Sequence, residues 1–126
     1  MHFGMNVLVM NKPLFIGINP TKARHRKGCA LDRLMNWIEE MDLGIVAFTN
    51  LSHDPHWNKR SVDPHFLLAG AREHTKVIAL GGLVSNTLSK LNIEHFTLPH
   101  PSPLNRQIND PDFIRKKLEE CRNYLK

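Results

Sequence analysis

The sequence predicts a single α/β domain, built as a three-layer α/β/α sandwich around a parallel sheet. Four short apolar runs have the composition of strands that are buried on both faces. Segments with a helical spacing of apolar residues separate these runs and follow the last one. This alternation of strands and helices is typical of three-layer parallel α/β domains. With 126 residues, the chain can form one core but is too short for two, so one domain is expected over residues 1–126.

The apolar runs give the predicted strands in chain order. They span residues 14–18, 45–50, 77–80 and 93–98. A short additional edge strand is expected at residues 6–10, just before Asn11-Lys12-Pro13.

The predicted helices differ in the strength of their apolar stripes. The first stripe is followed by Gly44 as a stop, and its members are Leu31, Leu34, Met35, Ile38 and Met41. A weaker pattern at residues 66–70 indicates a second helix. The third helix is short and is entered through Gly81-Gly82, and its apolar residues are Val84, Leu88 and Leu91.

The C-terminal helix has the clearest sequence signals. Asp110 is a good N-cap, and Pro111 follows at the first helical position. Its single stripe consists of Ile114, Leu118, Cys121 and Leu125.

Composition narrows the class of protein. Its 17 Lys and Arg against 12 Asp and Glu give a net charge of +5, and part of the excess lies between Lys22 and Lys27. Such a basic cluster favours a nucleic-acid partner, although a solvated basic face has the same composition. Two cysteines exclude a disulfide framework and a four-thiolate iron–sulfur cluster. No apolar stretch approaches the roughly 20 residues that cross a bilayer, and no signal segment is recognisable, so a cytoplasmic protein without membrane contact is expected.

Two motifs each follow a predicted strand. Gly17-Ile18-Asn19-Pro20 comes after the first strand, and His100-Pro101-Ser102-Pro103-Leu104-Asn105 comes after the last. Loops at the carboxyl ends of parallel strands meet at one edge of the sheet, where ligands bind. We therefore expect the amide and the histidine to face each other across one pocket.

The two motifs, in this order, resemble the active-site signatures of the uracil-DNA glycosylase superfamily, in particular its branches with Asn in the first motif. The resemblance implies a strand order of 2-1-3-4. A monomer without cofactor or metal is expected. The resemblance implies hydrolysis of the N-glycosidic bond of uracil, or of a related 5-substituted pyrimidine, in DNA. The alternative is an inactive or divergent member that binds a nucleotide, a modified base or uracil-containing DNA. A mononucleotide-binding α/β regulator would need only the fold and the basic rim.

The resemblance also assigns roles to residues of the pocket. His100 would donate a hydrogen bond to the departing base, and Asn19 would position the attacking water. Asn50, at the end of the second strand, would read the edge of the base, because a fixed amide pairs with uracil and not with cytosine. Gly17, Ile18 and Phe48 would complete the base site. Asn19 and Asn50 are also ordinary turn residues, which is the simpler interpretation of each one alone.

A second group of residues is expected to contact DNA. Ser102 and Pro103 would hold a phosphate, and Leu104 would fill the gap left by the extruded base. The remaining expected contacts come from basic side chains, namely Arg24, Arg26, Lys27, Lys59, Arg60 and Arg106.

The chain departs from the superfamily pattern after the first motif. Thr21 stands where Gly or Ser is usual, and no aromatic residue lies between positions 21 and 30 to stack on the base. Phe48, Trp57 or His25 would have to supply this stacking contact instead. His53 and His56 form a His-x-x-His pair, but no third ligand falls at a typical zinc spacing, so no metal is predicted.

Overall fold

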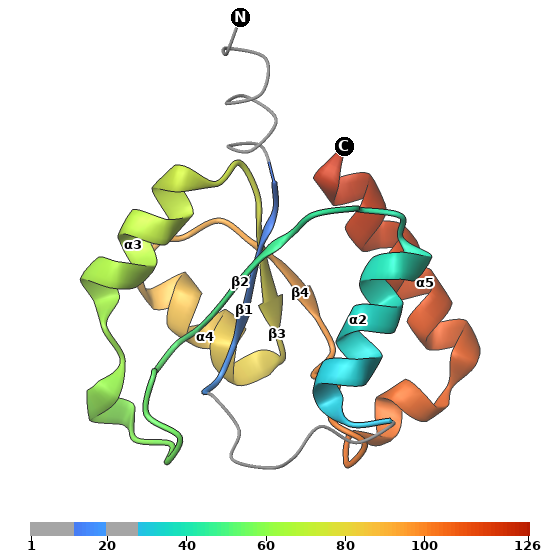
Figure 1. Cartoon of the computed structure of the whole chain (residues 1–126), viewed down its shortest axis with the longest axis horizontal. Coiled ribbons are helices and arrows are strands. Elements are labelled where there is room, and N and C mark those ends of the chain that lie inside the picture. Colours follow the sequence, from blue (N-terminus) through green and yellow to red (C-terminus); the bar gives the residue numbers. More distant parts are fainter. Residues whose placement is uncertain (1–11, 20–27) are drawn as a thin grey trace, which may run out of the picture.

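Four parallel strands form one sheet in the order β2-β1-β3-β4, with helices on both faces (Figure 1). This computed structural model describes residues 12–19 and 28–126. The strands are β1 (Leu14–Gly17), β2 (Ala47–Asn50), β3 (Val77–Leu80) and β4 (Phe96–Leu98). The predicted three-layer fold and its strand order are confirmed.

Burial along the strands follows their place in the sheet. Every residue of β1 and β3, the two central strands, is buried. The edge strands β2 and β4 are only partly buried, so the prediction that all four strands are covered on both faces is wrong for these two. An edge strand has a neighbouring strand on one side only and is therefore less covered. Ile45, at the start of the second predicted run, lies outside β2 and is 80% exposed.

Alternate residues of the strands build a core on each face of the sheet. Phe15 of β1 and Ile78 of β3 face helices α2 (Ala30–Glu40) and α5 (Pro111–Leu125). Ile16 of β1 and Ala79 of β3 face α3 (Pro64–Glu73) and α4 (Gly82–Lys90). Figure 1 shows α2 and α5 on one side of the sheet, and α3 and α4 on the other. Two short 3₁₀ helices, η1 (Lys59–Ser61) and η2 (Arg106–Asn109), complete the described elements.

Helix α2 differs from its predicted stripe. Trp37 is buried, whereas Leu31 and Met35 are 49% and 58% exposed. The helix also ends earlier than expected. Asp42 takes the left-handed conformation directly after the Met41 cap, with φ of 55°, and the predicted stop Gly44 takes it two residues later, with φ of 70°.

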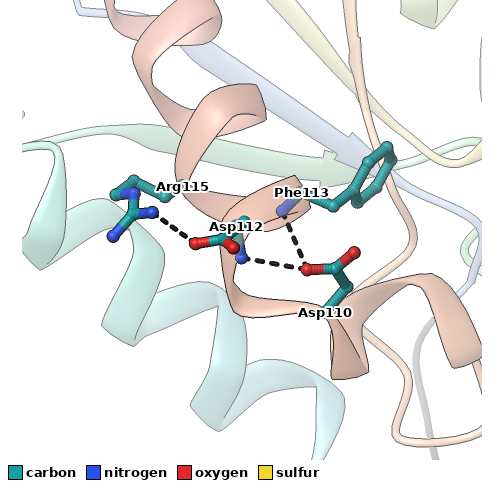
Figure 2. A network of polar contacts seen from close by, with 4 residues as sticks. All are labelled: Asp110, Asp112, Phe113 and Arg115. Atoms are coloured by element: carbon teal, nitrogen blue, oxygen red, sulfur yellow. Dashed lines mark hydrogen bonds and ion pairs between the residues drawn. The ribbon is translucent and has the colours of Figure 1, made fainter.

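Capping aspartates start two of the helices. Figure 2 shows the Asp110 carboxylate accepting hydrogen bonds from the backbone of Asp112 (3.1 Å) and Phe113 (3.3 Å), as predicted for the start of α5. Arg115 also pairs with Asp112 there. At α3, Asp63 caps Phe66 in the same way. These caps satisfy backbone donors that the first turn of a helix leaves without partners.

Several predicted features lie outside the described residues. These are the edge strand at 6–10, the basic side chains of Arg24, Arg26 and Lys27, and His25, one of the candidates for the stacking contact. Within the described part of the chain, no helix is both long and apolar enough to cross a bilayer.

Candidate functional site

The predicted site residues lie at the carboxyl-terminal rim of the sheet. Asn19 follows β1, Asn50 ends β2, and His100 follows β4 by two residues. This rim is the edge of the sheet farthest from the C-terminus in Figure 1. Because β3 lies between β1 and β4, the strands that present Asn19 and His100 are about 10 Å apart, or two strand spacings. A nucleoside-sized ligand can bridge such a gap.

Gly17, Phe48 and Asn50 form one cluster on the α2 and α5 side of this rim. Gly17 pairs in register with Asn50 across β1 and β2. A Cβ atom at position 17 would lie 2.9 Å from Asn50 Oδ1 and 3.3 Å from Phe48 Cζ. The absence of a side chain at Gly17 therefore lets the amide and the ring lie against β1. Phe48 is 49% exposed, which leaves its ring available to a ligand.

Ile18 is separated from this cluster. Its side chain packs against the core on the opposite face of the sheet, with α3 and α4. Its carbonyl accepts a hydrogen bond from the backbone N–H of Ser52 (3.1 Å). Ile18 thus holds the loop after β2, and the structure does not place its side chain with the other predicted base-binding residues.

The orientation of the Asn19 amide is fixed by the loop that follows β2. Its Nδ2 donates to the carbonyl of Pro55 (2.7 Å) and to that of Asp54 (3.3 Å). These bonds turn the amide nitrogen toward the loop and the Oδ1 atom away from both carbonyls. Sequence reasoning did not identify this support, because backbone carbonyls carry no residue-type signal.

His100 is held as a neutral imidazole with a defined tautomer. The backbone N–H of Ser102 donates to its Nδ1 (3.1 Å), so Nδ1 carries a lone pair and the proton of the neutral ring is on Nε2. Burial lowers the pKa of His100 from its ordinary value of 6.5. Near neutral pH, the side chain is therefore a hydrogen-bond donor through Nε2 without a positive charge.

Two residues outside the predicted set position His100. Gly81 has φ of 96°, and a Cβ there would lie 3.2 Å from His100 Cβ, so glycine admits both the backbone turn and the close approach. Asn105 Nδ2 donates to the His100 carbonyl (3.0 Å). The Gly81-Gly82 pair was visible in the sequence, but its spacing indicated only the start of a helix.

The loop after His100 is tied together by its own polar groups. The Leu104 N–H donates to Ser102 Oγ (3.2 Å), and the Asn105 N–H donates to the Ser102 carbonyl (2.9 Å). Since the amides of Ser102 and Leu104 already have acceptors, a phosphate contact at Ser102 would use its hydroxyl. Leu104 is 90% exposed at the tip of this loop, and Pro103 and Arg106 beside it are also exposed.

The basic residues Lys59 and Arg60 lie in η1, in the loop that follows β2, and both are exposed. A groove of about 480 Å³ continues past His100 along the open edge of β4 toward Lys117 of α5. Neither Asn19 nor Asn50 lines this groove, so it is not the predicted pocket that Asn19 and His100 would share. In the described part of the chain, no three His, Cys, Asp or Glu side chains gather as metal ligands would. His53 instead contacts the ring of Phe66 edge-on, with 4.9 Å between the ring centroids.

No protein-family model, no curated protein and no solved structure matches this chain.

Proposed function

We propose that the protein is a DNA glycosylase that hydrolyses the N-glycosidic bond of uracil, or of a related 5-substituted pyrimidine, in DNA. The observation that carries this proposal is the state of His100, a neutral imidazole with its proton on Nε2, on the same rim as two amides. Base removal needs a donor for the departing base, a group that positions water, and a group that reads the base.

The donor acts on the negative charge of the leaving base. When the bond between the sugar C1′ and the base nitrogen breaks, electrons move onto the base and charge builds on its carbonyl oxygen. The Nε2–H of His100 would donate to that oxygen more strongly in the transition state than in the ground state. Removing one such donor typically costs about 10²–10³ in rate. A neutral donor suits this task, because it keeps its proton throughout the reaction.

Asn19 would position the water that attacks the sugar. With its nitrogen held by the carbonyls of Asp54 and Pro55, the Oδ1 atom is the part of the amide that accepts from water. An amide cannot remove the proton of that water or place a full negative charge beside the sugar cation. Catalysis would therefore depend more on leaving-group stabilisation by His100 than it would with a carboxylate at position 19.

The cluster of Gly17, Phe48 and Asn50 would hold the base. The Asn50 amide offers a donor and an acceptor to the edge of uracil, and cytosine presents the opposite polarity there. The exposed ring of Phe48 offers a stacking surface beside that amide. Stacking on an aromatic side chain contributes about 1–3 kcal/mol per base in single-strand binders. Phe48 thereby supplies the aromatic contact that the segment after the first motif lacks.

The experiment that tests this function uses an oligonucleotide with one uracil. The oligonucleotide is incubated with the protein and treated with alkali, which breaks the strand where a base has been released. We expect strand breaks with the wild-type protein, and His100→Ala and Asn19→Ala should each reduce their rate by about 10²-fold or more. Binding of DNA should be nearly unchanged in both variants, because affinity rests on phosphate contacts.

A base that leaves easily separates the two roles. A 5-fluoro pyrimidine needs less stabilisation of negative charge, so the loss caused by His100→Ala should shrink on this substrate. The loss caused by Asn19→Ala should shrink less, since water must still be positioned. Stable binding of uracil-containing DNA without strand breaks would reject the hydrolase and leave the binding protein in its place.

A further inference from the structure

The loop that follows β2 contains a buried hydroxyl with a structural task. Ser52 is only 1% exposed, and it is the one polar residue among the buried residues of the described chain. Its backbone N–H bonds to Ile18, and the residue forms an isolated antiparallel bridge with Val62. The chain between Ser52 and Val62 is therefore a loop closed at its base, next to the first motif.

Within this loop, four groups form a chain of hydrogen bonds with one direction. The Asp54 N–H donates to Ser52 Oγ (3.1 Å), and the Ser61 hydroxyl donates to the carbonyl of Asn58 (2.6 Å). The two hydroxyls are 2.5 Å apart. Because the proton of Ser61 is used on Asn58, the hydroxyl of Ser52 is the donor to Ser61. Every donor in the chain thus has one acceptor.

Asp54, the first donor in this chain of bonds, also holds Asn19. Asp54, which donates to Ser52, presents its carbonyl to Asn19 Nδ2, and the neighbouring Pro55 presents a second carbonyl. The position of these carbonyls determines which way the Asn19 amide is turned. We infer that Ser52 and Ser61 are positioning residues for Asn19, acting through the backbone of Asp54 and Pro55. That the two serines orient the Asn19 amide does not depend on the proposed glycosylase function. Only the effect of this orientation on catalysis rests on it.

Loss of either hydroxyl has a specific consequence. In Ser61→Ala, the hydroxyl of Ser52, which is itself only 1% exposed, would lose its acceptor, and a buried donor without a partner is unfavourable. To reach another acceptor, the Ser52 side chain would rotate about χ1. This rotation moves Oγ, and the Asp54 N–H that donates to it would move as well. The Asn19 amide would then lose its fixed orientation, while its residue type and the rim around it stay the same.

The first test follows the Asn19 side-chain amide by ¹⁵N NMR. The resonance pair is assigned by its absence in Asn19→Asp. In Ser61→Ala, we expect these two amide protons to shift and to exchange faster with solvent. Ser61→Thr, which keeps the hydroxyl, and Ser89→Ala, a matched change on the exposed surface of α4, should leave them in place. If Ser61→Ala does not fold, Ser61→Cys takes its place. Its thiol is a weaker acceptor than a hydroxyl, so the Asn19 amide protons should shift in the same way but by less.

The second test is kinetic. In Ser61→Ala, base release should fall about two- to tenfold, the range that one intramolecular hydrogen bond contributes, and the loss should appear in kcat and not in KM. In an Asn19→Ala background, the same change should have no further effect, because there is no amide left to orient.

The outcomes separate this inference from the proposed function. If the wild type releases no base but Ser61→Ala still moves the Asn19 resonances, the glycosylase function is wrong and the positioning role stands. If the Asn19 resonances are unchanged in Ser61→Ala and Ser61→Cys, the positioning role is wrong, whatever the activity. An equal rate loss with and without Asn19 would also overturn it, since the effect would then not pass through that amide.

Discussion

At the scale of single residues, the protonation of His100 decides what chemistry the rim can perform. The Ser102 N–H occupies the lone pair of Nδ1, and a proton at that nitrogen would meet another N–H group. Burial acts in the same direction and lowers the pKa of the ring. Both effects oppose the imidazolium, so the site favours a neutral donor over a general acid. A donor of this kind stabilises charge without losing its proton.

This state of His100 makes a prediction about stability and pH. Above pH 6.5, the ordinary pKa of the ring, both folded and unfolded chains carry neutral histidine. As the pH falls below that value, the unfolded chain binds a proton before the folded one does, so the free energy of unfolding decreases until the folded-state pKa is passed. In His100→Asn, whose amide oxygen can still accept from Ser102, this loss should be absent. Urea unfolding at about pH 7.5 and about pH 5 measures both proteins. Equal decreases in the two would show that His100 titrates alike in both states.

Gly17 makes a second prediction at this scale. A methyl group at position 17 would overlap Asn50 Oδ1, at 2.9 Å, and crowd the Phe48 ring. We expect Gly17→Ala to displace the Asn50 amide and the Phe48 ring at only a small cost in the free energy of unfolding, because the atoms that the methyl group meets are the ends of side chains that can move. Base release should fall as well, because the amide that reads the base is displaced.

Gly82→Ala is the matched control, since no atom lies within 4 Å of a Cβ there. Its stability, measured by denaturant unfolding, should equal or slightly exceed that of the wild type. A Gly17→Ala protein with wild-type stability and wild-type base release would remove the cluster from the base site.

The side chains of the candidate site could be predicted from the sequence, but the backbone groups that hold them in place could not. The two motifs contain Asn19 and His100, the resemblance singled out Asn50 at the end of the second strand, and the structure places all three on one rim. The supports are backbone carbonyls at Asp54 and Pro55 and a backbone N–H at Ser102. Such groups are the same in every residue, so only the path of the chain reveals which of them meet a side chain.

At the scale of elements, the six-residue loop from His100 to Asn105 positions two different side chains. Its start holds the imidazole, and its tip presents Leu104, which is 90% exposed. The hydrogen bonds that Ser102 and Asn105 form within the loop, to His100 and Leu104, make it a defined turn. A rigid turn can hold an apolar side chain outside the core, where water contact is unfavourable unless a ligand covers it.

Leu104 makes a prediction about the form of DNA. If the side chain enters the space left by an extruded base, it offsets the cost of unstacking, about a few kcal/mol per base step. A single strand has less stacking to lose. We therefore expect Leu104→Ala to reduce base release from duplex DNA far more than from single-stranded DNA, measured with the same uracil sequence in both forms. Equal losses on the two substrates would remove the wedge role.

The elements themselves were predictable where burial is strongest. The third strand was predicted at its observed limits, because all four residues of β3 are buried apolar side chains. The outer strands were predicted too long, since apolar residues such as Ile45 and Ile93 continue the pattern beyond the paired residues. The stripe of α2 included Met35 instead of Trp37, because periodicity gives the spacing of a helix face but not which of two adjacent faces meets the sheet.

At the scale of the whole molecule, parallel topology separates the two ends of the sheet. All four strands run in one direction, so the loops after β1, β2 and β4 share one rim, and the helices return the chain to the other. Lys59 and Arg60 belong to the loop after β2, on the site rim. Lys90, at the last residue of α4, belongs to the opposite rim. Basic side chains thus lie both on the edge that would face DNA and on the edge that would not.

This division predicts a salt dependence that differs between positions. Each lysine or arginine that contacts a phosphate releases counterions, which changes the slope of log affinity against log salt by about 0.9 for duplex DNA and about 0.7 for a single strand. Lys59→Gln and Arg60→Gln should each reduce the slope by roughly that amount and weaken binding about equally on all sequences. Lys90→Gln, an equal loss of charge on the far rim, should leave the slope unchanged.

Fluorescence anisotropy of a labelled oligonucleotide across a salt series measures all four proteins. At saturating DNA, base release by the Lys59 and Arg60 variants should match the wild type, because neither side chain takes part in bond cleavage. A slope that falls equally in the Lys90 variant would mean that DNA is attracted by the total charge of the molecule, and the rim would then lose its role as the DNA-binding edge.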